Sequence, residues 1–174
     1  GTYDGQFSVA PGTNGTQEDP IILCGSRGAI LDQGGTSGYT FHLEADHWIL
    51  SGFTIARGQK CLMLDGANHN RLRDLELRDA GMEILHFRCS SSDNTVEDSV
   101  IHGSGKADDG SSGFAEGVYI GTNTGVCKAT NKDDRSDRNH VLRNDIYDIY
   151  SECIDAKEGT FDGEIRGNTF DANL

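Results

Sequence analysis

The chain has 174 residues, the size of a single domain, and its 28 Asp and Glu against 15 Lys and Arg give a formal net charge of -13. This charge argues against a nucleic-acid backbone or an anionic membrane surface as the partner. The 23 glycines follow no three-residue period and apolar residues recur throughout, which excludes collagen and disorder. No apolar run approaches the roughly 20 residues that cross a bilayer, so we expect no membrane insertion.

Short alternating segments run along the chain without helical periodicity. A first coil is expected near residues 7–9 and a second near residues 21–31. After them, pairs of apolar residues two positions apart predict short strands that each turn one face inward. These pairs are Phe41 and Leu43, Leu62 and Leu64, Leu85 and Phe87, Val118 and Ile120, and Ile154 and Ala156.

A second pattern recurs at a nearly constant spacing, for example from residue 50 to 72 and from 72 to 96, with one longer gap. In it an apolar residue precedes Gly, Asp or Asn by two positions and another bulky residue by five. Its members are Leu50-Gly52-Ile55, Leu72-Asp74-Leu77, Val96-Asp98-Ile101, Leu142-Asn144-Tyr147 and Ile165-Gly167-Phe170. We expect the first residue of each member to stack in one internal column.

Short strands at a constant period, with polar corners between them, predict an all-β fold, a right-handed parallel β-helix (solenoid) of about seven coils. The handedness follows from the general rule for parallel crossovers. Residues 1–174 would form one domain, with loop insertions at 102–115 and 122–138. The alternative, an antiparallel β-sandwich, requires hairpin turns and no constant period. The last coil looks unfinished, so a homodimer or a second polypeptide is expected at the C-terminal end.

Five cysteines in a chain of this size favour an oxidising compartment. The sequon Asn14-Gly15-Thr16 fits a secreted glycoprotein. Cys89 and Cys127 follow equivalent strands of successive coils and are the first candidate disulfide, and Cys24 with Cys61 is the second. The fifth, Cys153, is expected to be a buried free thiol. The sequence therefore predicts an extracellular protein.

Four strings of the sequence resemble the pectin-lyase-like right-handed β-helix superfamily, and within it secreted microbial members. They are Pro20–Arg27, Glu116–Gly121, Asp134–Asn139 and Glu152–Gly159. The resemblance covers essentially the whole chain and implies the fold. It leaves the activity open, because this architecture carries lyases, hydrolases, tail-spike proteins and non-catalytic binders.

Stacking the coils brings distant polar residues together on one face. Glu83, Glu116 and Glu152 are expected to form a ladder at the strand entrance, with adjacent coils ~4.8 Å apart. On the outward face follow two further rows. They are His42, Met63, His86, Tyr119 and Asp155, and then Glu44, Asp65, Arg88, Gly121 and Lys157. Stacked carboxylates repel one another unless a proton or cation intervenes, or unless Lys or Arg side chains pair with them.

Calcium suits this ladder, because it is a hard cation that takes carboxylate oxygens. The predicted ligands are Glu116, Glu152 and Asp155. The chain is here similar to the calcium-dependent alginate lyase and chondroitinase B group, in which a Lys follows an acidic ligand by five residues, as Lys157 follows Glu152. The catalytic Arg of that group has no counterpart here.

The resemblance to this group implies β-elimination on an acidic, uronate-containing polysaccharide. Calcium would neutralise the substrate carboxylate, and Lys157 would be the base if its pKa were lowered. Tyr119 would stack on the sugar or act as the acid, and His86, Arg88 and Asp155 would bind it.

Two other functions stay open at this point. In a glycoside hydrolase of the polygalacturonase kind, Glu116 and Glu152 would be the paired carboxylates, at the ~5–5.5 Å separation of a retaining mechanism. The chain has neither the Gly-His-Gly nor the Arg-Ile-Lys string of that family. In the third interpretation the chain is a non-catalytic glycan-binding, host-interacting or immunoactive protein that uses its stacked side chains for recognition.

Overall fold

The computed structural model describes residues 1–107, 114–123, 125–127 and 134–171. The regular secondary structure of these residues is β-strand, arranged in three parallel sheets that are named here after their first strands. The β1 sheet consists of β1 (Thr2–Asp4), β4 (Ile30–Asp32), β7 (Thr54–Ala56), β10 (Glu76–Arg78), β13 (Val100–His102), β16 (Asp145–Tyr147) and β19 (Thr169–Asp171).

The other two sheets have six strands each. The β2 sheet consists of β2 (Phe7–Val9), β5 (Tyr39–Leu43), β8 (Lys60–Asp65), β11 (Leu85–Arg88), β14 (Val118–Ile120) and β17 (Ile154–Ala156). The β3 sheet consists of β3 (Ile21–Cys24), β6 (Trp48–Ser51), β9 (Arg71–Arg73), β12 (Thr95–Glu97), β15 (His140–Leu142) and β18 (Glu164–Arg166).

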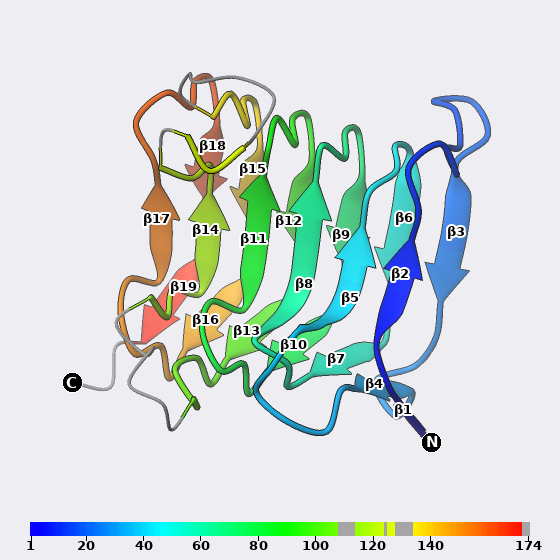
Figure 1. Ribbon diagram of the computed structural model, residues 1–174, viewed down its shortest axis with the longest axis vertical. Coiled ribbons are helices and arrows are strands. Elements are labelled where there is room, and N and C mark those ends of the chain that lie inside the picture. The colour runs from blue at the N-terminus through cyan, green and yellow to red at the C-terminus, as the bar shows by residue number, and fades with distance from the viewer. Residues whose placement is uncertain (108–113, 124, 128–133, 172–174) are drawn as a thin grey trace.

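The chain visits the three sheets in turn and advances by one strand position at each round, which makes a parallel solenoid of about seven coils (Figure 1). In Figure 1 the β2 sheet faces the viewer, the β3 sheet lies behind it and the β1 sheet closes the bottom. Every strand pairing in the described residues is parallel, so the predicted β-helix is confirmed and a hairpin-built sandwich is excluded.

The described residues include no helix that is both long and apolar enough to cross a membrane.

The core is a set of internal ladders, as the alternating pattern predicts. Leu62, Leu64, Leu85 and Phe87 are completely buried and lie in register across β8 and β11. On the β3 sheet Leu50 pairs with Leu72, and Leu72 pairs with Val96. Each of these residues packs between equivalent residues of the coils above and below, because the period of the sequence matches the length of a coil.

The next rung of this column corrects the predicted register by one residue. Val96 is paired with Val141, whereas Leu142 is paired with Glu97. On the β1 sheet Ile101 is likewise paired with Ile146, and Tyr147 lies outside against His102.

The corner residues show why the register differs. Gly52, Asp74, Asp98, Arg143 and Gly167 all take the left-handed conformation, with φ from 50° to 86°. Arg143 therefore fills the corner position that we predicted for Asn144. Because Val141 and Leu142 are adjacent apolar residues, the sequence allowed either of them to be aligned with Val96.

Asn144 instead forms, with Asn168, the shorter of two asparagine ladders inside the corners of the β3 sheet. The longer ladder consists of Asn70, Asn94 and Asn139, none more than 2% exposed. Asn94 Oδ1 accepts hydrogen bonds from the Asn70 backbone N–H at 2.9 Å and from Asn70 Nδ2 at 3.0 Å. Asn94 Nδ2 donates to the Ala67 carbonyl at 2.9 Å and to Asn139 Oδ1 at 3.1 Å. These side chains satisfy backbone groups that the turns leave unpaired.

The cysteines confirm one predicted bridge and correct the other. Cys89 and Cys127 form a disulfide across 38 residues, whereas Cys24 and Cys61 are both free thiols. The Cys24–Cys61 bridge was wrong because the two residues belong to different sheets. Cys24 is exposed in β3, and Cys61 is buried in β8 with its thiol donating to the Arg78 carbonyl. Cys153 is a free thiol of intermediate burial.

At the C-terminal end of the solenoid, Ile165 and Phe170 are 51% and 49% exposed. The predicted homodimer or second polypeptide at this end stays a prediction.

Candidate functional site

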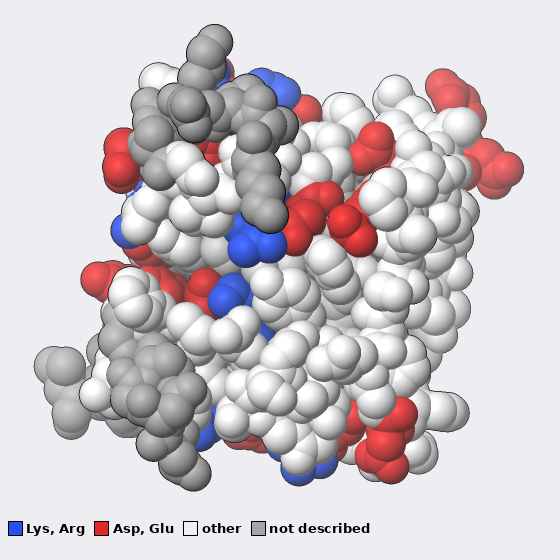
Figure 2. Space-filling model, viewed as in Figure 1, with Lys and Arg blue, Asp and Glu red and all other residues white. Residues whose placement is uncertain are grey.

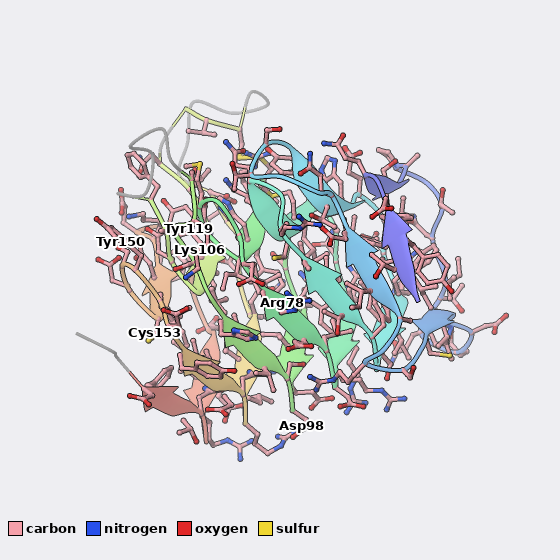
Figure 3. The ribbon with its side chains drawn as sticks, turned by 90° about the horizontal axis from the view of Figure 1, so that it is seen from below. Arg78, Asp98, Lys106, Tyr119, Tyr150 and Cys153 are labelled. Atoms are coloured by element: carbon pink, nitrogen blue, oxygen red, sulfur yellow. A yellow bond between two sulfur atoms is a disulfide. The ribbon has the colours of Figure 1, made fainter. Side chains whose placement is uncertain are left out.

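The outward side of the β2 sheet carries the predicted rows of polar residues in the predicted register. His42 pairs with Met63, Met63 with His86, His86 with Tyr119 and Tyr119 with Asp155. Figure 2 shows acidic and basic side chains gathered over β8, β11, β14 and β17 on this face. Tyr119, which is labelled in Figure 3, belongs to β14.

Tyr119, Asp155 and Lys157 form a cluster on this face. Lys157 Nζ lies 2.7 Å from Asp155 Oδ2 and 5.2 Å from the centroid of the Tyr119 ring. Asp155 raises the pKa of Lys157 well above its ordinary value, so the amine is held in its charged form. Burial raises the pKa of Tyr119, and the neighbouring Lys157 ammonium opposes that shift. Two proton donors therefore stand side by side in the free protein.

This charge state bears on the predicted base. Lys157 was expected to act as the base if its pKa were lowered, and its ion pair with Asp155 has the opposite effect. The three residues are brought together as predicted, but Asp155 holds Lys157 as an acid.

His86 is far less accessible than its predicted substrate-binding role requires. Its side chain is 3% exposed, and Nε2 donates a hydrogen bond to the Gly121 carbonyl at 2.8 Å. Nδ1 lies 3.2 Å from Glu83 Oε1. The ring also lies against Tyr119, with the two centroids 4.4 Å apart. Both ring nitrogens thus face groups of the chain itself.

Arg88 is accessible but already paired. Its Nε and Nη2 atoms each lie 2.7 Å from an oxygen of Asp65, a bidentate pair between neighbouring coils. His42 Nε2 approaches the same carboxylate at 2.9 Å. Burial raises the pKa of Asp65, but the hydrogen bonds from His42 and Arg88 outweigh burial and lower this pKa well below its usual range. Sequence reasoning placed Asp65 in the right row and gave it no role.

The predicted ladder of Glu83, Glu116 and Glu152 also forms, but the three carboxyl groups have different polar neighbours. The Ile84 N–H bonds the Glu116 carbonyl, and the Gly117 N–H bonds the Glu152 carbonyl, so the three glutamates lie on successive coils. Glu83 Oε2 lies 2.9 Å from Lys60 Nζ, and Glu152 accepts a hydrogen bond from the Ser151 hydroxyl. Glu116 is 6% exposed, and its Oε2, like Glu83 Oε2, has no hydrogen-bond partner among the described residues.

These surroundings decide the charge on Glu116. Burial, followed by the charges of Glu83, Asp155 and Glu152, raises its pKa. Within the described part of the chain, no three His, Cys, Asp or Glu side chains are grouped so that they could hold a metal ion. Calcium binding by Glu116, Glu152 and Asp155 stays a prediction.

The two predicted insertions come directly after β13 and β14 in the sequence. Parts of both, residues 108–113, 124 and 128–133, lie outside the described residues. The second insertion is tied down by the Cys89–Cys127 disulfide. The Asp134 carboxylate also accepts hydrogen bonds from the backbone N–H groups of Cys89 and Ser90, at 2.8 and 2.9 Å.

A groove lined by described residues lies elsewhere on the molecule. It has a volume of about 940 Å³ and lies over the outer side of the β3 sheet, between the segment 16–20 and the stacked rings of His47 and His69. None of the residues predicted for the site on the β2 sheet lines this groove.

Comparisons with known proteins bear on this arrangement. A family model described as right handed beta helix region matches residues 40–174. Among solved structures, an alginate lyase from Paenibacillus sp. str. FPU-7 superposes with a TM-score of 0.84 at 33% sequence identity. The match covers 97% of this chain and 56% of the alginate lyase, so the chain spans about half the length of that enzyme. A search of the curated proteins found no match.

Proposed function

Because the chain belongs to the right-handed β-helix family, we propose that it is a polysaccharide lyase that cleaves acidic, uronate-containing glycans by β-elimination. The observation that carries the proposal is the contact of Tyr119 with Lys157 on the outward face of the β2 sheet. The likeness to an alginate lyase over 97% of this chain supports the same reaction. The disulfide and the exposed Asn14 of the sequon support an extracellular protein that carries a glycan.

β-Elimination needs a base and an acid, and a syn elimination takes both from one face of the sugar. The base removes the proton from the carbon next to the uronate carboxylate, a double bond forms, and the bond to the glycosidic oxygen on the adjacent carbon breaks. The acid gives a proton to that oxygen. One proton is taken and one is delivered, so two neighbouring titratable groups can complete the step.

The surroundings of Tyr119 and Lys157 assign these two roles. Asp155 stabilises the Lys157 ammonium, and this ammonium in turn favours the ionised form of Tyr119. Asp155 thus keeps the proton on Lys157, which leaves Tyr119 as the group of the two that can give up its proton. We assign the base to the Tyr119 phenolate and the acid to the Lys157 ammonium, which exchanges the roles expected from the sequence.

Substrate binding falls to the remaining cationic groups of the face. Arg88 uses Nε and Nη2 for Asp65, and its remaining N–H groups can bond a uronate carboxylate, since guanidinium carries five donors. Asp155 orients Lys157 and is a positioning residue in this scheme.

Calcium has no step in this scheme. Asp155 is paired with Lys157 and Glu152 is bonded to Ser151, so two of the three predicted ligands are engaged with the chain itself. Calcium binding by Glu116, Glu152 and Asp155 stays a prediction from the sequence.

The proposal is tested by incubating the protein with alginate, pectate and chondroitin and following the ultraviolet absorbance of the unsaturated product. We expect absorbance to appear with at least one of these polymers and to be lost in Tyr119→Phe. New reducing ends without absorbance would instead identify a glycoside hydrolase. Binding without any product would identify a glycan-binding protein, the alternative that the two protonated groups of the free protein favour.

A further inference from the structure

Three ionisable side chains lie buried in a line that ends at Tyr119. Lys60, Glu83 and His86 are 5%, 4% and 3% exposed. Lys60 Nζ lies 2.9 Å from Glu83 Oε2, and Glu83 Oε1 lies 3.2 Å from His86 Nδ1. The His86 ring rests against the Tyr119 ring. The line crosses from β8 to β14, and the scheme proposed above does not use it.

Burying these ionisable side chains lowers the free energy of unfolding. Buried ion pairs lose hydration that their mutual attraction often fails to restore, and apolar residues of similar volume are often at least as stabilising. The chain itself supplies the comparison. Met63 occupies the same outward position as His86 on the preceding coil and is completely buried. Packing at this position is therefore satisfied by an apolar side chain, so the polar character of His86 needs another explanation.

We infer that Lys60, Glu83 and His86 are positioning residues that fix the Tyr119 ring for the elimination step. The inference rests on the proposed function, because it assigns Tyr119 a reacting atom.

The contacts show how the line would hold Tyr119. His86 Nε2 donates to the carbonyl of Gly121, the residue directly after β14, at 2.8 Å. This bond ties the end of β14 to β11. Glu83 faces the other ring nitrogen, and Lys60 holds Glu83 from the opposite side. The Tyr119 ring then lies between the His86 ring, at 4.4 Å between centroids, and the Lys157 ammonium, at 5.2 Å from its centroid.

The charge on Glu83 maintains this order. Burial raises the pKa of Glu83, but His86 and Lys60 outweigh burial and lower it, so Glu83 is a carboxylate. A carboxylate accepts but does not donate hydrogen bonds. The Gly121 carbonyl also only accepts, so Nε2 carries the hydrogen of that bond, and Nδ1 faces Glu83 Oε1 at 3.2 Å without a hydrogen bond.

The first test is His86→Met, which copies the residue that the chain places at the equivalent position of the preceding coil. We expect a folded protein whose kcat on the cleaved polymer falls about 10²-fold, the loss that a small misplacement of a catalytic group produces, with KM little changed. The double variant Lys60→Met with Glu83→Gln removes both charges together and leaves neither one unpaired. This double variant should lower kcat in the same way. Adding His86→Met to it should lower kcat little further, because the effects of substitutions within one network are not additive.

The second test follows Tyr119 directly and does not need activity. With ring-labelled tyrosine, the Tyr119 signal should change its chemical shift and its pH titration in His86→Met and in the double variant. The matched control is His69→Met, which replaces a stacked histidine on the β3 sheet and should alter neither the Tyr119 signal nor kcat.

The outcomes separate the two proposals. A folded His86→Met with the parent's kcat and an unchanged Tyr119 signal would overturn the inference. If the parent protein cleaves none of the polymers, the proposed function fails, and the Tyr119 signal alone decides whether the line positions that ring.

Discussion

Glu83 and Glu116 occupy equivalent places on neighbouring coils, and the Oε2 atom of each has no hydrogen-bond partner among the described residues, yet Glu83 has the Lys60 ammonium beside it at 2.9 Å. Equivalent positions of a solenoid thus differ in the charge that they carry. The lowered pKa of Glu83 makes it a carboxylate, and the raised pKa of Glu116 favours its neutral form. This difference leads to the first prediction.

Glu116→Gln should stabilise the protein as the pH rises. A carboxyl with a raised folded-state pKa contributes its full stability below its ordinary pKa and loses it as the pH rises through the folded value. Glutamine keeps the neutral shape at every pH. The melting temperature of Glu116→Gln should therefore equal that of the parent near pH 4. Near pH 8 it should exceed that of the parent by roughly 2–4 °C for each kcal/mol of unfolding free energy gained. Equal melting temperatures at both pH values would contradict the raised pKa.

Tyr119→Phe should lower kcat by about 10²–10⁴-fold on the cleaved polymer, the usual contribution of a general acid or base. The ring and its contact with His86 are kept, so substrate stacking is little affected. Tyr147→Phe is the matched control, because Tyr147 stacks on His102 on the β1 sheet. Steady-state kinetics of both variants check this prediction, which fails if the two lose activity equally.

The pH profile should report the ionisation of Tyr119. Since the phenolate is the assigned base and burial raises the pKa of Tyr119, kcat/KM should climb with pH through the alkaline range. In Lys157→Ala the ammonium that favours the phenolate is gone, so the rising limb should move to higher pH and the maximum rate should fall. A limb that stays in place would show that Lys157 does not act on Tyr119.

Calcium should leave the melting temperature of the parent unchanged, because Asp155 and Glu152 are already engaged with Lys157 and Ser151. The measurement is a thermal melt with calcium against chelator. A rise that follows mass action, ~2.7 kcal/mol at a hundred times the Kd, and that is lost in Glu152→Gln would instead establish the site predicted from the sequence.

Asn94→Ala should cost roughly 2–5 kcal/mol of unfolding free energy, since it leaves buried N–H and C=O groups of the ladder without partners. Thr95→Ala, one residue along on the outward side of β12, is the matched control and should change stability little. Denaturant unfolding of the two variants measures the difference, and equal midpoints would show that water replaces the ladder.

The sequence predicted the repeat and its two faces because both follow from period and alternation. It placed Tyr119, Asp155 and Lys157 together for the same reason. It could not fix the register at Val141 and Leu142, where two apolar residues are adjacent and the choice depends on which residue takes the left-handed corner. The pairing of Lys60 with Glu83 and the burial of His86 were also out of reach, because they depend on how far each side chain bends over the strand entrance.

The parallel stacking also determines how protection against exchange with solvent varies along the molecule. Each strand of the β2 sheet is held by its two neighbours, except the outermost ones, and β17 is the last strand of that sheet in the described chain. Local opening free energies are lowest where few neighbours hold a segment. Amide hydrogens of Ile154–Ala156 should therefore exchange with deuterium sooner than those of Leu62 and Leu64 in β8. Asp155 would then lie on a strand that one described neighbour holds, whereas Tyr119 lies on β14, which β11 and β17 hold from both sides.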